Sequence, residues 1–98
     1  MASIVRERLA QILFVAGKLT AYDAHKHYII LFSATSRRNV YYQLKKGVDM
    51  GIFEIIDVVE EKGDYSWGLT ARKIYYGLKN KDGVVPMKKV MNHFKVKE

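Results

Sequence analysis

The sequence predicts a small α+β domain in which three helices are followed by a β-hairpin and then by further helices. Apolar residues recur at helical spacing up to Gly51, and β-branched residues dominate from Ile52 to Val59. The chain has 98 residues, of which 49% are hydrophobic, so it can fill one core of its own. We therefore expect a single globular domain.

The first helix is expected to begin after a Ser3 cap and to run to about Ala16, with Gly17 as its stop. Its buried stripe is predicted to consist of Val5, Leu9, Ile12, Leu13 and Ala16. Phe14 falls on the opposite side of this helix. It is either a stray surface residue or part of a subunit contact, and we favour the contact.

A second, short helix is predicted from about Ala21 to Tyr28. It follows a start that resembles a capping box, Thr20 to Asp23, with Asp in place of the preferred Glu or Gln. His25 and His27 are two residues apart and point to nearly opposite sides, so they cannot share a metal ion. The chain then turns towards Ser33, which gives two helices joined by a few residues, the arrangement of a helix-turn-helix.

The third helix, residues 35–50, is the element with the strongest functional signal. Successive residues turn by about 100°, which gathers Val40, Leu44, Gly47, Val48 and Gly51 on an inner side. The outer side collects Thr35, Arg38, Asn39, Tyr42, Lys45, Lys46 and Asp49, with Arg37 and Tyr41 on the flanks. Cations, an amide and a phenol are groups that pair with phosphates and base edges. A solvated amphipathic helix is the alternative.

A hairpin is predicted after Gly51, with a turn at residues 60–64 and a returning strand at residues 65–69. Three helices and a hairpin are the order of a winged helix. Thr70 is expected to cap a fourth helix, from Ala71 to about Leu78. A last helix is predicted to start near Pro86, with an apolar stripe of Met87, Val90, Met91 and Phe94.

The positive charge is concentrated at the end of the chain. The net charge is +7; residues 1–70 carry nine Lys/Arg against eight Asp/Glu, and residues 71–98 carry eight against two. A polyanionic partner is therefore indicated, although a basic tail is also compatible with a merely solubilising surface. We divide the chain into a domain at residues 1–80 and a basic helical extension at residues 81–98.

Several functions are disfavoured by what the sequence lacks. It has no Cys, and its longest apolar run, Tyr28 to Phe32, is too short to span a bilayer. Charged residues lie where a signal peptide would begin its apolar stretch, so we expect a cytoplasmic protein. No phosphate-binding loop or hydrolase motif is present, and we expect no enzymatic activity, no cofactor, no metal and no evident small-molecule ligand.

Residues 1–80 resemble the winged helix-turn-helix domain of MarR- and PadR-type transcriptional regulators. The resemblance lies in Leu19-Thr20, in Val40-Tyr-Tyr-Gln-Leu44-Lys-Lys leading to Met50-Gly51-Ile52, and in Tyr65-Ser-Trp-Gly-Leu69-Thr70. It implies that residues 36–46 enter a major groove, that the hairpin around Lys62 approaches the DNA backbone, and that terminal helices form a dimer. Two features depart from the family pattern: Gly47 stands where a large aliphatic residue is usual, and the wing tip is acidic.

We therefore predict a dimeric regulator that binds double-stranded DNA sequence-specifically. The expected groove contacts are Ser36, Arg37, Arg38, Asn39, Tyr42 and Gln43, and the expected phosphate contacts are Lys45, Lys46, Lys62, Arg72 and Lys73. The expected dimer interface comprises Phe14, Met87, Val90, Met91 and Phe94. The alternatives are an architectural or partition protein that coats DNA and a winged helix that binds other proteins.

Overall fold

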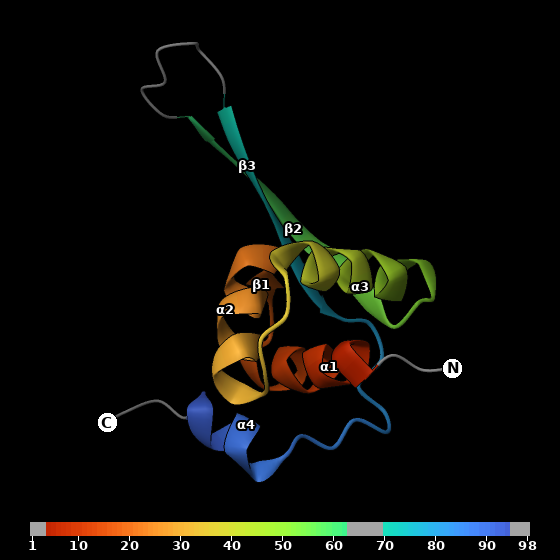
Figure 1. Ribbon diagram of the computed structural model, residues 1–98. Helices are drawn as coiled ribbons and strands as arrows, with labels where there is room; N and C mark the ends of the chain where they lie inside the picture. Colours follow the sequence, from red (N-terminus) through yellow and green to blue (C-terminus); the bar gives the residue numbers. More distant parts are fainter. Residues whose placement is uncertain (1–3, 63–69, 95–98) are drawn as a thin grey trace.

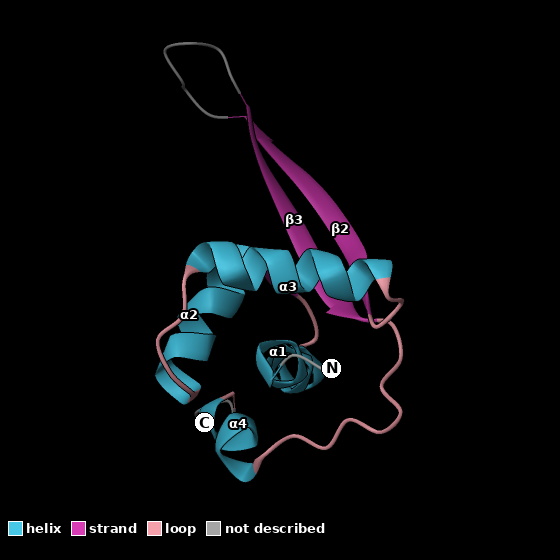
Figure 2. Cartoon of the chain, turned by 45° about the vertical axis from the view of Figure 1, so that its right-hand side comes forward, coloured by secondary structure: helices cyan, strands magenta, loops and turns pink. Residues whose placement is uncertain are grey.

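The computed structural model describes residues 4–62 and 70–94, and the side chains of residues 4–60 and 73–94. Its elements are α1 (Ile4–Ala16), β1 (Leu19–Thr20), α2 (Ala21–Leu31), α3 (Arg37–Asp49), β2 (Phe53–Lys62), β3 (Thr70–Leu78) and α4 (Lys88–His93). Helices α1, α2 and α3 form the body of the molecule, the β2–β3 hairpin projects from it, and α4 lies across α1 from α3 (Figure 1; Figure 2). This is the predicted winged-helix arrangement with an added C-terminal helix.

The core is formed where α1, α2 and α3 meet the base of the hairpin. Its members share near-complete burial and include Leu9, Ile12, Leu13, Ala24, Tyr28, Val40, Leu44, Phe53, Tyr76, Leu78 and Val90. The inner stripes predicted for α1 and α3 therefore face the core, except Gly51, which is exposed and lies beyond the end of α3. Phe14 is half-buried and packs against this core, so it is not the fully exposed aromatic that the helical spacing of α1 predicts.

Side-chain caps define where α2 and α3 begin. The Thr20 hydroxyl accepts a hydrogen bond from the Asp23 N–H at 3.2 Å, and the Ser36 hydroxyl accepts one from the Asn39 N–H at 3.0 Å. Ser3, the predicted cap of α1, lies outside the described residues. Helix α2 continues three residues beyond its predicted end, because the apolar run from Tyr28 extends the helix to Leu31.

Residues 70–78 form a strand, and the predicted helix from Ala71 to Leu78 is wrong. Strand β3 is central in an antiparallel sheet of order β1-β3-β2. It pairs with β1 through Leu19↔Tyr76 and with β2 from Phe53↔Leu78 to Lys62↔Thr70. The β-branched and aromatic side chains of residues 74–76 suit a strand that pairs on both edges. Thr70 is thus the first residue of β3 and not a helix cap.

The hairpin differs from its prediction in extent. Residues 60–62 belong to β2, although the sequence analysis assigns them to a turn. The register with β3 shifts between Ile55 and Asp57, which is a β-bulge at Ile56. The predicted strand at residues 65–69, including Trp67, lies outside the described residues.

Gly47 is buried where α3 crosses the base of β2. A Cβ atom built at this position would overlap the ring of Phe53, which is itself buried. The absence of a side chain at Gly47 lets another side chain approach α3 closely. The neighbour that needs the space is Phe53.

Helix α4 is held against its own chain. Val90 is 0% exposed, and the Gln11 side-chain oxygen accepts a hydrogen bond from the Met87 N–H at 2.8 Å. The ring nitrogens His27 Nδ1 and His93 Nε2 are 2.8 Å apart and join α2 to α4. Val90 is therefore unavailable to a partner subunit in this arrangement, which corrects its assignment to a dimer interface. His27 is likewise not an isolated surface residue.

Candidate nucleic-acid interface

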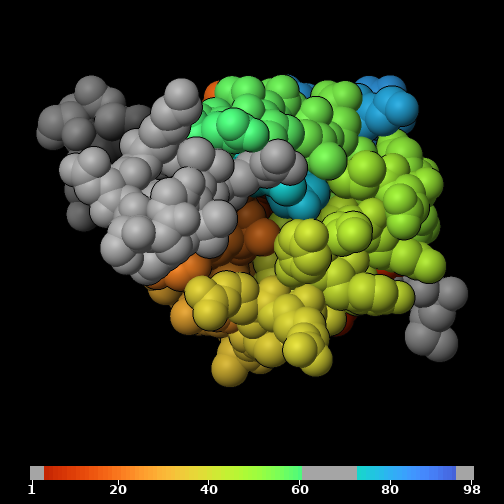
Figure 3. Space-filling view, turned by 90° about the horizontal axis from the view of Figure 1, so that it is seen from above, coloured from red at the N-terminus to blue at the C-terminus, as the bar shows by residue number. Residues whose placement is uncertain are grey.

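The outer face of α3 is open. Its exposed side chains include four cations and one phenol, Arg37, Arg38, Tyr42, Lys45 and Lys46, and the carboxylate of Asp49 at the end of the helix. Tyr42 is 57% exposed and lies between the arginines at the start of the helix and the lysines near its end. Within the described part of the chain, no other element covers this row, and α3 and the hairpin form one face when the molecule is seen from above (Figure 3).

Asn39 has a structural role at the start of α3. Its side-chain amide donates a hydrogen bond to the Thr35 hydroxyl at 3.0 Å, and its backbone N–H is capped by Ser36. The Thr35 carbonyl in turn contacts the His25 ring at 2.7 Å. Asn39 is half-buried and helps to fix the α2–α3 turn, so it is less available for groove contact than its position on the helical wheel predicts.

Gln43 points away from the outer face. Its side-chain oxygen accepts a hydrogen bond at 2.7 Å from a guanidinium N–H of Arg6, which belongs to α1. The residue is half-buried. In this structure the Gln43 amide therefore braces α3 against α1, and its contact with a base stays a prediction.

Two exposed tyrosines that the sequence analysis does not select lie beside this row of cations. The Arg37 guanidinium and the Lys26 ammonium lie 5.7 and 5.8 Å from the centre of the Tyr22 ring. The Lys45 ammonium lies 5.7 Å from the centre of the Tyr41 ring. These distances allow cation–π attraction, which positions the two cations of α3. The available signal for Tyr22 is its place two residues after the Thr20 cap, in the first turn of α2.

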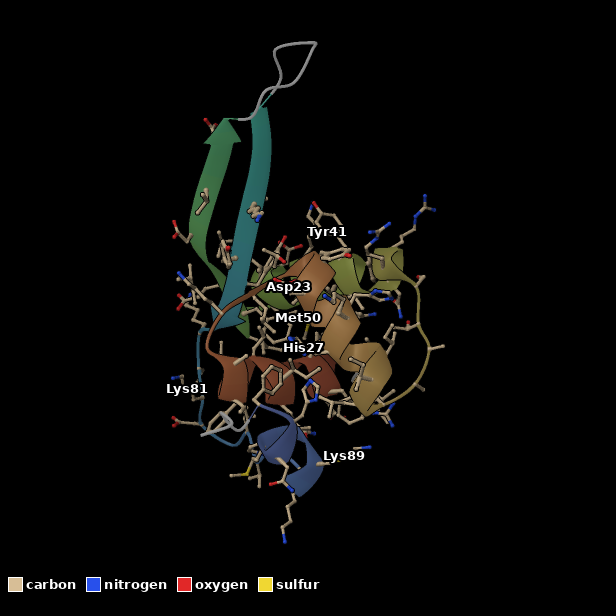
Figure 4. All side chains as sticks on the ribbon, turned by 90° about the vertical axis from the view of Figure 1, so that its left-hand side faces the viewer. Asp23, His27, Tyr41, Met50, Lys81 and Lys89 are labelled. Atoms are coloured by element: carbon tan, nitrogen blue, oxygen red, sulfur yellow. The ribbon has the colours of Figure 1, made fainter. Side chains whose placement is uncertain are left out.

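A hollow of about 520 Å³ lies between the start of α2, α3 and strand β3. It is lined by Thr20, Ala21, Tyr22, Asp23, Tyr41, Lys73, Ile74 and Tyr76. Of these residues, Asp23 of α2 and Tyr41 of α3 are labelled in Figure 4. Burial raises the pKa of the Tyr76 phenol, with a smaller contribution from Tyr41, so this phenol stays neutral and can donate a hydrogen bond.

The predicted phosphate contacts of the hairpin lie on β2 and β3. Lys73 is exposed and lines the hollow. Lys62 pairs with Thr70, and Arg72 pairs with Glu60, in the sheet register. The backbone thus carries all three cations on the projecting hairpin, beyond the core.

A second group of cations lies on the other side of the molecule. Lys88 and Lys89 are exposed on α4, and α1 separates α4 from α3 (Figure 1; Figure 2). The Lys89 ammonium lies 4.7 Å from the centre of the Phe32 ring. A single straight duplex lying on α3 would not reach these lysines.

The described residues contain no cluster of three or more His, Cys, Asp or Glu side chains that could hold a metal ion. Among the helices of the described ranges, none is both long and apolar enough to cross a membrane.

These features define a winged-helix domain with an exposed, cationic third helix. By structure, the whole chain is similar to Bacillus subtilis PadR, solved in complex with operator DNA, with a TM-score of 0.58 and 17% sequence identity. The chain spans about half of the length of that protein, 49%. No protein-family model matches the chain, and no curated protein matches it by sequence. The fold is therefore of the PadR winged-helix type, as the resemblance in sequence implies.

Proposed function

We propose that this protein binds double-stranded DNA by placing the outer face of α3 in a major groove, and that it regulates transcription. The observation that carries the proposal is the open row of Arg37, Arg38, Tyr42, Lys45 and Lys46 on a helix that other elements support from behind. The similarity in fold to PadR, whose structure was solved in complex with operator DNA, supports the proposal that this protein binds DNA.

The side chains of α3 have different roles in this proposal. Arg38 and Tyr42 are exposed on the outer face and are the proposed base contacts, because guanidinium and phenol groups hydrogen-bond to base edges. Arg37, Lys45 and Lys46 are the proposed phosphate contacts, which position the helix without reading sequence. Ser36 and Asn39 order the start of α3 through the cap and the bond to Thr35.

The hairpin supplies further phosphate contacts in the proposed complex. Lys73 at the hollow would meet the DNA backbone next to the groove that α3 occupies, and Lys62 and Arg72 would follow it farther along the hairpin. The exposed carboxylates of β2 oppose this approach through like-charge repulsion. We therefore assign most of the binding free energy to α3.

We also propose that the protein binds DNA as a homodimer. Of the residues selected for an interface, Met87 and Met91 are 47% and 53% exposed on α4, whereas Phe14 and Phe94 are half-buried in their own chain. The exposed methionines therefore carry this proposal, together with the neighbouring Val85, which is 81% exposed.

The test compares the two basic sides of the molecule. Arg38→Ala is expected to weaken specific DNA binding by roughly 1 to 3 kcal/mol, as for the loss of one base contact. Lys88→Ala is the control, because it removes a cation from α4 on the other side of α1. Fluorescence anisotropy with sites selected from random duplexes measures both affinities.

Three other results would contradict the proposal. If Lys88→Ala lost DNA while Arg38→Ala bound normally, the wrong surface has been assigned. Binding that falls steeply with salt but ignores sequence would indicate a DNA-coating protein instead. Absence of binding at low salt would leave only a protein-binding role.

A further inference from the structure

Strand β2 has a free edge. In the sheet order β1-β3-β2, strand β3 occupies one edge of β2, and no segment of the described ranges pairs with the other. The strand is ten residues long, Phe53–Lys62. A free strand edge presents backbone N–H and C=O groups that another extended chain can pair with.

The side chains of β2 leave apolar surface for such a chain to cover. Ile55, Ile56, Val58 and Val59 are 49%, 47%, 49% and 37% exposed. The pairing places Ile55 and Val58 on the face of Tyr76 and Ile74, and Val59 on the opposite face with Lys73. A strand added at the free edge would cover branched side chains on both faces of the hairpin.

The charge of β2 selects the partner. Its sequence, FEIIDVVEEK, has four acidic residues and one lysine in a protein whose net charge is +7. Pairing with a second copy of β2 would bring two acidic strands together, and a DNA backbone would be repelled in the same way. Asp57 already forms an ion pair with Lys18 at 3.8 Å. A segment with lysine or arginine between apolar residues would pair with the exposed Glu54 and cover the aliphatic side chains.

We infer that the free edge of β2 binds an extended, basic segment of another protein by strand addition. This goes beyond DNA binding, and among the proposed DNA contacts only Lys62, the last residue of β2, lies on this strand. Seen from above, β2 lies along one margin of the molecule and the α2–α3 turn along the opposite margin (Figure 3). The proposed protein contact and the start of the DNA-binding helix therefore occupy separate places.

An eight-residue peptide of alternating lysine and valine, with blocked ends, tests the inference without DNA. Hydrogen exchange measured by NMR is expected to slow for those β2 amides that do not bond to β3, and for few others. The control peptide has the same sequence with alternate backbone nitrogens methylated, which removes the donors of one edge and keeps the charge. Equal binding of the two peptides would overturn strand addition.

A matched pair of variants tests the role of charge. Glu54→Lys, on β2, is expected to weaken peptide binding about fivefold, whereas Glu7→Lys, an equal change on α1, is expected to leave it nearly unchanged. An equal effect of both variants would show that only net charge matters and would overturn the assignment. No protection of β2 at millimolar peptide would also overturn it. Protection of the β2 amides that appears without peptide and grows with protein concentration would overturn it too, because a second copy of the protein would then be the occupant.

Discussion

Gly47 shows how one missing side chain allows α3 and β2 to pack together. Glycine inside a helix costs about 1 kcal/mol relative to alanine, so an exposed site would gain stability from Gly→Ala. Here the added methyl group would overlap the buried Phe53 ring, including Cγ, the atom that joins the ring to the rest of the side chain. The ring is buried and cannot move into solvent. Gly47→Ala is therefore expected to destabilise the protein by about 1 to 3 kcal/mol, measured by urea unfolding.

The matched control is Lys45→Ala on the exposed side of the same helix, which should change stability by about 0.5 kcal/mol or less. A Gly47→Ala protein as stable as the wild type would show that α3 and Phe53 can separate at little cost. Combining Gly47→Ala with Phe53→Leu removes the ring and should make the added methyl group less damaging.

For single residues, the sequence predicts which side of a helix faces the core better than it predicts individual side-chain contacts. The rotation of 100° per residue correctly places Val40, Leu44 and Gly47 inside and Arg38 and Tyr42 outside. Gln43 lies at a boundary between the faces, where a flexible side chain can turn either way. Its direction depends on Arg6, which is 37 positions away in the chain and reaches Gln43 only in the folded protein.

The pair of His27 and His93 links two elements, α2 and α4, in a way that depends on pH. One ring donates its N–H to the other across 2.8 Å, and the Phe94 ring packs 4.6 Å from the His27 ring centre. Burial lowers the pKa of His27 from 6.5, and His93 and Lys26 lower it further, whereas Asp23 opposes them. The other cations near this contact are Lys89 on α4 and Arg8 on α1, which both approach Phe32.

The docking of α4 is therefore expected to weaken in acid. At pH values well above 6.5, His27 is neutral in both the folded and the unfolded chain, and its titration changes nothing. Below pH 6.5 the unfolded chain takes up the proton more readily, so stability falls as the pH drops towards the lowered pKa of the folded state. Urea unfolding at pH 8 and pH 5.5 should show this loss, and methyl NMR signals of Val90 should report it at α4.

His93→Gln isolates the cause, because glutamine keeps a hydrogen-bonding group and cannot become a cation. This variant should lose less stability between the two pH values than the wild type. His25→Gln is the control, since His25 contacts the Thr35 carbonyl on the other side of α2. If His93→Gln and the wild type lost stability equally, the histidine pair would not be the acid-sensitive contact.

Elements near the end of the chain were harder to predict than those at its start. In residues 70–78, Ile74 and Leu78 are four apart, as on a helix face, but Ile74, Tyr76 and Leu78 also alternate as in a strand. The local pattern permits both. Residues 70–78 form a strand because they pair with β1 on one edge and with β2 on the other. These partners lie as far away in the sequence as Leu19, so the local pattern does not reveal them.

At the scale of the whole molecule, the positions of α3 and α4 restrict how two copies can share a duplex. Helix α4 lies across α1 from α3, so a partner stacked directly beneath α4 would direct its own α3 away from the DNA (Figure 2). A two-fold axis running from the α4 side to the α3 side avoids this, because both third helices then face the same duplex. The proposed dimer is therefore joined along a flank of α4.

The dimensions of the chain agree with such a side-by-side pair. Its principal extents are 44 × 37 × 24 Å, so the centres of two adjacent copies are separated by a distance in this range. One turn of B-DNA, about 34 to 36 Å, lies within it. Bound sites selected from random duplexes are consequently expected to contain two inverted half-sites about one helical turn apart.

Met91→Glu places a carboxylate on the exposed side of α4 and should yield a protein that sediments as a monomer and no longer prefers paired half-sites. Asn92→Glu adds the same charge to an exposed neighbour on α4 and is expected to remain a dimer if Met91 lies in the interface. A Met91→Glu protein that still sediments as a dimer and still protects two half-sites would exclude α4 from the interface. The flank of α4 would then be free, and the second subunit would have to meet the first through α1 or α2.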